Sequence, residues 1–229
     1  MDFSASLQFG FDRVKANPGF YVGGGAVLFG LSVVVNLVSR LIMLVVSLAV
    51  GAVMQTAHID PPIVAALLGV FGAVVSSVLG LIVVPFGVGY FRGIRKDVHG
   101  EPAVIGDLFS AFDIALPSIL NYALAGVVTG LGFLFCILPG IALMPVTLLT
   151  VYFLVNGQTE GISAFTSALK TLRENPMLIV WNLVVGLVAG MGVLACCVGL
   201  LFTVPIAVCA LYKLFDDAAA GGRSAPSYY

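Results

Sequence analysis

The sequence predicts an all-α, six-helix integral membrane protein made of three repeats, each an amphipathic interfacial helix followed by a transmembrane hairpin. Three observations predict this fold: scarce charge, six long apolar segments, and a recurring order of amphipathic stretch, proline and hairpin. Of the 229 residues, 60% are apolar and only 9% are charged. Because a soluble domain carries about 25% charged residues, the composition excludes an ordinary soluble globule.

Six apolar segments approach or exceed the length of a membrane span, which is about 17 to 25 residues. They cover residues 19–54, 62–90, 117–137, 140–156, 177–195 and 198–214. As a helix the first would measure roughly 54 Å, against about 30 Å of hydrocarbon core. Dividing it at residues 36–40 would leave almost no residues for a turn and would export the basic residues that follow the second segment. We therefore expect one long helix and a first hairpin taller than the other two.

The basic residues indicate how the chain is oriented. Nine of the ten lie before the first segment or after the second, fourth and sixth: Arg13, Lys15, Arg92, Arg95, Lys96, Lys170, Arg173, Lys213 and Arg223. Since basic flanks mark cytoplasmic loops, both termini are expected in the cytoplasm. No signal-peptide cleavage site is evident, so the first span is expected to be retained.

An amphipathic stretch precedes each hairpin, with apolar residues at helical spacing. The three stripes are Phe3, Leu7, Phe11 and Val14; Ile105, Leu108, Phe109 and Phe112; and Ile162, Phe165, Leu169 and Leu172. Prolines follow at Pro18, Pro117 and Pro176. Such stripes favour helices in the cytoplasmic headgroup plane, with a bend into the bilayer at each proline. Helices packed on the bundle outside the membrane are the alternative.

These features predict a single membrane domain of residues 1–220, with repeats over approximately 1–92, 105–157 and 161–215, and a linker-like tail over 221–229. Small residues four apart follow each proline at similar distances. The pairs are Ala26 and Gly30, Gly126 and Gly130, and Gly186 and Gly190. Because small residues allow close backbone approach in lipid, they predict helix-packing faces, either within one chain or between chains.

Arg40 is the one ionisable residue inside an apolar segment. It lies 22 residues after Pro18, about 33 Å along an untilted helix and thus level with the outer headgroups. We expect it to reach lipid phosphates; a bond to a neighbouring chain and a solute pathway are the alternatives. The cytoplasmic group Arg92, Arg95 and Lys96 is a second candidate for lipid or partner contact, or simply the anchor of the topology.

Other polar residues of the spans have structural interpretations. Asn36, Asn121 and Asn182 are expected to form hydrogen bonds at helix interfaces, with ligand binding as the alternative. Cys136, Cys196 and Cys197 fall near the outer ends of spans. They are expected to act as small apolar residues, and a disulfide between hairpin tips is the alternative.

No motif of catalysis or metal binding occurs. H-E-x-x-H, G-x-S-x-G, Walker A and C-x-x-C patterns are missing from the sequence, and His58 and His99 fall on opposite sides of the predicted membrane. We therefore expect no enzyme activity, no cofactor and no metal. The net charge of −1, with no basic stripe, excludes nucleic acid as an expected partner.

Several segments together resemble bacterial polytopic proteins related to the membrane domain attached to some glycerophosphodiester phosphodiesterases. They are Leu138-Pro139-Gly140-Ile141, Gly161-Ile162-Ser163-Ala164-Phe165 to Asn175-Pro176, Thr203-Val204-Pro205 to Ala210-Leu211-Tyr212, Gly89-Tyr90, His99-Gly100-Glu101 and Gly106-Asp107-Leu108-Phe109. The resemblance covers most of the chain and implies a six-helix protein of the bacterial inner membrane. It implies no catalytic residues, because the phosphodiesterase domain has no counterpart here.

These expectations converge on a non-catalytic inner-membrane subunit that builds or anchors an assembly. Its partners would be membrane lipids and either further copies of itself or other membrane proteins, because an overlong apolar hairpin needs a cover. The alternative is a channel or carrier for a small or lipid-like solute, with a path between repeats.

Overall fold

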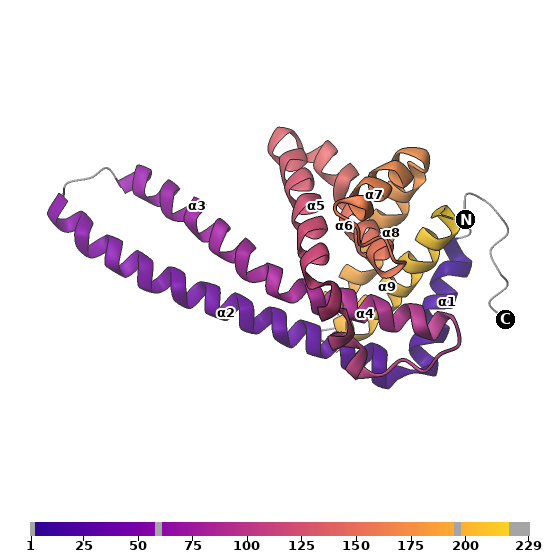
Figure 1. Ribbon diagram of the computed structural model, residues 1–229. Helices are drawn as coiled ribbons and strands as arrows, with labels where there is room; N and C mark the ends of the chain where they lie inside the picture. Colours follow the sequence, from indigo (N-terminus) through magenta and orange to yellow (C-terminus); the bar gives the residue numbers. More distant parts are fainter. Residues whose placement is uncertain (1–2, 58–60, 195–197, 220–229) are drawn as a thin grey trace. The chain divides into compact units, whose positions relative to one another are not determined.

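The computed structural model describes residues 3–57, 61–194 and 198–219 (Figure 1). All regular structure in these ranges is helical, so the all-α prediction is confirmed. The α-helices are α1 (Phe3–Ala16), α2 (Pro18–Ala57), α3 (Pro61–Gly80), α4 (Val84–Val98), α5 (Ala115–Phe135), α6 (Ile137–Val155), α7 (Ser163–Glu174), α8 (Met177–Leu194) and α9 (Val198–Ala219), and the 3₁₀ helices are η1 (Leu81–Val83) and η2 (Ile105–Ile114).

Five helical segments are long and apolar enough to cross a membrane. They are Pro18–Ala52, Pro62–Val98, Ile105–Phe135, Ile137–Val155 and Gly199–Ala219. A sixth candidate arises if α7 and α8, which are bent by 100° at their junction, count as one broken span. These lengths and compositions are those of a multi-pass membrane protein.

The first apolar segment forms one continuous helix, as predicted. α2 runs for 40 residues without a break at residues 36–40. The second segment also falls within one long span candidate, Pro62–Val98, although a 3₁₀ turn after Gly80 leads from α3 into α4. Pro85 has no N–H to donate to the Leu81 carbonyl, which accounts for the tightened turn at this point.

The described chain forms two compact units. One comprises residues 27–83, and the other combines residues 1–26 with residues 84–219. In the larger unit α5 packs against α6, α8 against α9, α1 against α9, and α4 against η2. Its core includes the fully buried side chains of Ile94, Leu108, Leu149 and Phe215.

The hairpins α5–α6 and α8–α9 have matching internal contacts at positions 60 residues apart. Thr129 Oγ1 donates to the Leu143 carbonyl at 3.3 Å, and Thr203 Oγ1 donates to the Ala189 carbonyl at 3.1 Å. Positions 129 and 143 correspond to 189 and 203, so equivalent positions are joined in both hairpins. The threonine lies on the first helix in α5–α6 and on the second helix in α8–α9.

Glycines bring the same two hairpins into close contact at equivalent depth. A Cβ on Gly132 would lie 3.1 Å from the backbone of Gly140, and one on Gly192 would lie 2.9 Å from the backbone of Leu200. Both pairs again correspond at an interval of 60 residues. The helices of each hairpin therefore approach closely where a side chain is missing.

The predicted stripe of α1 is only partly correct. Val14 is buried, but Phe11 is 55% exposed, and the buried positions before Val14 are Ser6 and Gly10. A Cβ on Gly10 would overlap the Ile206 carbonyl oxygen of α9. Close packing of the α1 backbone against α9 needs small residues. The buried face of α1 therefore lies beside its most apolar face.

The second stripe was expected to follow α-helical spacing, and this expectation is wrong. Residues Ile105–Ile114 form a 3₁₀ helix, which has three residues per turn. That geometry places Leu108 and Ala111 on one buried face, while Phe109 and Phe112 remain exposed. The carboxylate of Asp107 accepts the Val104 N–H at 3.0 Å and so holds the start of this helix.

The third stripe packs within the larger unit. Phe165 and Leu172 of α7 are buried, whereas Ile162 precedes the helix and is exposed. Asn121 of α5 lies beneath the start of α7: its Nδ2 donates to the Gly161 carbonyl at 2.8 Å, and its Oδ1 accepts the Phe165 N–H at 3.0 Å. The predicted role of Asn121 in packing is confirmed.

Candidate functional site

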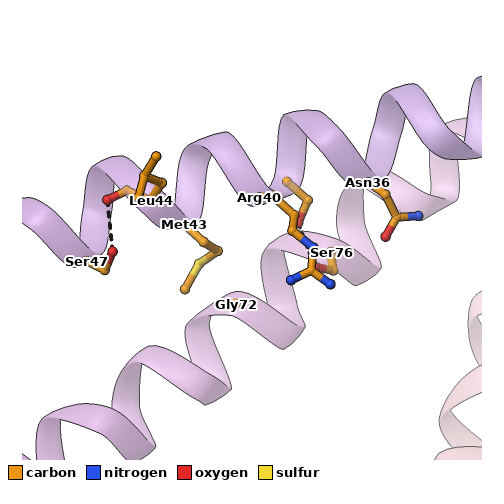
Figure 2. A pocket seen from close by; sticks show the side chains of 8 residues that line it. Asn36, Arg40, Met43, Leu44, Ser47, Gly72 and Ser76 are labelled. Atoms are coloured by element: carbon orange, nitrogen blue, oxygen red, sulfur yellow. Dashed lines mark hydrogen bonds between the residues drawn. The ribbon is translucent and has the colours of Figure 1, made fainter.

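A polar notch interrupts the apolar surface of the unit formed by residues 27–83. It is a pocket of about 510 Å³ between α2 and α3, lined by Asn36, Ser39, Arg40, Met43, Leu44, Ser47, Gly72 and Ser76. We call it the Arg40 notch. Figure 2 shows Arg40 and Met43 directed from α2 toward α3.

Two contacts fix the antiparallel register of the helices around the notch. The Oγ atoms of Ser39 and Ser76 lie 2.7 Å apart in a hydrogen bond. One helical turn away, the Met43 side chain lies over Gly72, where an added Cβ would come within 3.0 Å of the Met43 methyl group. Gly72 therefore makes room for Met43, and the serine pair joins the two helices beside Arg40.

The remaining polar side chains of the notch bond to their own helix. Asn36 Nδ2 donates to the Ser32 carbonyl at 3.0 Å, and Ser47 Oγ donates to the Leu44 carbonyl at 2.9 Å. Asn36 is exposed, so the expected interface role is not seen within the described chain. Its amide retains one N–H that these bonds do not use.

Arg40 is the only Lys or Arg in residues 27–83, and residues 27–57 and 61–83 contain no Asp or Glu. Its side chain is exposed, and its guanidinium forms no hydrogen bond or ion pair with any residue that the structure describes. The notch thus presents a whole positive charge on an otherwise apolar hairpin. Such a charge attracts an anion strongly when water is scarce.

The basic group of α4 is engaged within the larger unit instead. Arg92 forms a two-pronged pair with Asp113, at 2.8 and 3.2 Å, and also bonds the Ser110 carbonyl. Lys96 pairs with the buried carboxylate of Asp107. These two basic side chains fasten η2 to α4, so much of their charge is already neutralised.

Arg95 fastens the end of α6. Its Nη1 donates to the Val155 carbonyl at 2.9 Å, which satisfies one of the carbonyls that a helix terminus leaves free. A pocket of about 490 Å³ lies over this region, with Glu101 and His99 among its lining residues. The acidic partners and Glu101 make this pocket a weaker anion site than the Arg40 notch.

The predicted packing glycines have open space where a side chain would lie. Side chains built at Gly30, Gly126, Gly130, Gly186 and Gly190 would meet nothing within 4 Å. These positions are therefore open for contacts outside the chain. The glycines that pack internally escaped the sequence analysis, although the 60-residue interval of Gly132 and Gly192 was a usable signal.

Ser39 and Ser76 were also missed. Their signal was positional: both lie about five helical turns from the His58–Asp60 connection, on opposite sides of it. An antiparallel hairpin brings such positions together. Of the cysteines, Cys136 is an exposed free thiol, while Cys196 and Cys197 lie outside the described residues, as do His58, Asp60 and Arg223.

Within the described ranges, no group of three His, Cys, Asp or Glu side chains is arranged to hold a metal ion. The chain matches no model of a protein family, no curated protein and no solved structure. The resemblance to phosphodiesterase membrane domains therefore stays a prediction.

Proposed function

We propose that the chain is a non-catalytic subunit of a bacterial inner membrane, which oligomerises or anchors an assembly through its long hairpin. The observation that carries this proposal is the surface of residues 27–83. Leu41, Val45, Leu48, Leu67 and Val70 are each between 61% and 66% exposed on that hairpin. An apolar surface of this extent needs lipid or protein to cover it.

Lipid alone is too thin to cover the hairpin when it stands upright. The 40 residues of α2 extend about 60 Å, twice the roughly 30 Å of a bilayer core. A strong tilt of α2 would reduce the mismatch between its length and the bilayer thickness, at a cost in free energy. Other subunits covering the outer part of α2 and α3 would remove it, which favours an assembly.

The open small-residue positions also support an assembly. A Cβ added at Gly126 or Gly130 of α5, or at Gly186 or Gly190 of α8, would meet nothing within 4 Å in the described chain. In a membrane, such positions let the backbone of another helix come close. Their partners would be further copies of this chain or other membrane proteins.

A six-span protein of three repeats, with both termini in the cytoplasm, is the topology that we propose. The 60-residue correspondence of the α5–α6 and α8–α9 hairpins supports duplication, and Pro85, Pro145 and Pro205 continue the same interval into the first hairpin. The first hairpin then differs by added length in both helices. The 100° bend between α7 and α8 supports a surface helix leading into a span.

Gentle extraction from native membranes followed by native mass measurement tests the proposal. We expect a complex larger than one chain, held together in detergent. A solitary chain that instead moves a solute across liposome membranes would favour the second candidate, a channel or carrier. The Arg40 notch is the specific observation in favour of that candidate, because it offers a polar binding site for an anionic or lipid-like solute.

A further inference from the structure

The positive charge in the Arg40 notch has no counter-charge among the described residues of its own unit. Residues 27–57 and 61–83 contain no carboxylate, and no described residue bonds the guanidinium. A charged side chain among apolar surroundings is costly unless it is paired or reaches a polar phase. The notch is therefore suited to an anion that the described part of the hairpin does not supply.

A second copy of the hairpin does not supply that anion. α2 continues for 17 residues past Arg40, about 26 Å along the helix, before the sequence reaches Asp60. Copies that share one orientation in the membrane keep Arg40 this far from the end of α2, and the sequence has no carboxylate between Arg40 and that end. Pairing two hairpins side by side would instead bring two arginines together, which repel.

The groups around Arg40 are hydrogen-bond donors. The guanidinium presents several N–H groups in a planar fork that matches two oxygens of a phosphate. Only one hydroxyl hydrogen is used between Ser39 and Ser76, so the other is left to donate outward. The second N–H of Asn36 adds a further donor one turn away. This set suits a phosphate better than a monodentate acceptor.

The walls of the notch are apolar, which narrows the chemistry of the ligand. Met43 and Leu44 line it, and the side chains of Leu37 and Val34, which lie on α2 between Arg40 and Pro18, are 59% and 55% exposed. A free phosphate ion would leave these surfaces uncovered. A molecule with an anionic head and hydrocarbon tails satisfies both parts at once.

We propose that the Arg40 notch binds one anionic phospholipid. Arg40 and the Ser39–Ser76 pair hold its phosphodiester, Asn36 supports them, and the acyl chains lie along the apolar faces of α2 and α3. The level of Arg40, one bilayer thickness along α2 from Pro18, is where outer-leaflet phosphates occur. The inference requires lipid at the hairpin and is independent of whether chains assemble.

Native mass spectrometry of the full chain tests the site, because it counts bound lipids and subunits in one spectrum. The detergent-extracted protein is supplied with phosphatidylglycerol, phosphatidylcholine or inorganic phosphate. We expect one retained phosphatidylglycerol per chain and weaker retention of phosphatidylcholine. Arg40→Gln should lower affinity for phosphatidylglycerol by about tenfold or more, since charge-assisted bonds are lost. The affinity of Arg40→Lys for phosphatidylglycerol should lie between those of the unchanged protein and Arg40→Gln, because lysine keeps the charge but lacks the planar fork of N–H groups.

A neighbouring pair of serines provides the matched control. Ser76→Ala should weaken retention several-fold, while Ser77→Ala should not, because Ser77 bonds the Ala73 carbonyl of its own helix and does not line the notch. Equal lipid retention in Arg40→Gln and the unchanged protein, or equal effects of the two serine changes, would overturn the proposal. So would equal binding of both lipids, or an inorganic phosphate adduct without retained lipid. Subunit number in the same spectra reports separately on assembly.

Discussion

Single glycines decide how closely the helices of the larger unit approach. A Cβ on Gly89 of α4 would overlap the carbonyl oxygen of Leu108 in η2, and one on Gly93 would overlap the ring of Phe20. Gly87, on the same helix, faces open space. The contact at Gly89 is backbone against backbone and the one at Gly93 is backbone against a ring, so even one methyl group is too large at either position.

Gly89→Ala should therefore lower stability by about 1 to 3 kcal/mol, because the Leu108 carbonyl cannot move away without shifting η2. Gly87→Ala should be neutral or stabilising by up to about 1 kcal/mol, since alanine is the better helix former. Thermal unfolding in detergent, followed by circular dichroism, measures both. Equal melting temperatures would show that α4 and η2 are not packed as described.

Asn121 shows how one polar side chain can organise a junction. It is fully buried and bonds the Pro117 carbonyl, the Gly161 carbonyl and the Phe165 N–H. Its amide thereby joins α5 to the start of α7. Removing it would leave the buried Phe165 N–H without this partner, which is more costly than losing an exposed hydrogen bond.

Asn121→Ala should consequently destabilise the protein by about 2 to 3 kcal/mol. Thr166→Ala is a suitable control, because the exposed Thr166 bonds only the nearby Ser163 carbonyl. Proteolysis of the α7 region under native conditions reports the difference. If both variants resist protease equally, Asn121 does not hold this junction.

Among the helices, the apolar composition predicted the extent of the long helix, but it did not predict which helix faces pack against their neighbours. The continuous helix over Pro18–Ala57 followed from an apolar run with no room for a turn. The buried face of α1 did not follow from its apolar stripe, because Gly10 packs against the Ile206 carbonyl. Likewise nothing in the apolar spacing of residues 105–112 distinguishes a 3₁₀ helix from an α-helix.

The residues of the Arg40 notch could be predicted only in part. Arg40 stood out because it is the only charged residue in the interior of an apolar segment, since Lys213 lies at the end of the sixth. Ser39 and Ser76 did not, since serine is common in membrane helices and their pairing depends on the register of the hairpin. The engagement of Arg92 and Lys96 with Asp113 and Asp107 required the position of η2, which the sequence pattern does not supply.

The Asp107 carboxylate is expected to hold the first turn of η2, and a substitution there tests this role. Its carboxylate accepts the Val104 N–H and pairs with Lys96, so Asp107→Asn should loosen the first turn. Because the Lys96 side chain is 43% exposed, the local cost should be only on the order of 1 kcal/mol. Hydrogen exchange should rise over residues 104–112 and stay constant in α9. Unchanged exchange over 104–112 would contradict this role for Asp107.

At the scale of the whole molecule, the proposal concerns surfaces that the chain leaves open. Gly126→Leu should reduce the assembled fraction about tenfold or more while leaving helical content intact, because a large side chain blocks close helix approach. Val127→Leu, at a position already 59% exposed, should have little effect. Native mass measurement of the two variants makes the comparison. Equal assembly would remove the α5 glycines from the interface.

The central claim is that the outer part of the long hairpin is covered by other protein. Cross-linking in native membranes tests it most directly. In a background where Cys136, Cys196, Cys197 and Cys209 are replaced, Leu48→Cys places a thiol at a position 66% exposed on α2. A short cross-linker with one thiol-reactive and one photoreactive end should then join Leu48→Cys chains to one another or to a partner protein, whereas Leu116→Cys, exposed at the start of α5, should join few. Unlinked chains at Leu48→Cys, with the thiol still reactive to a membrane-soluble label, would contradict the claim.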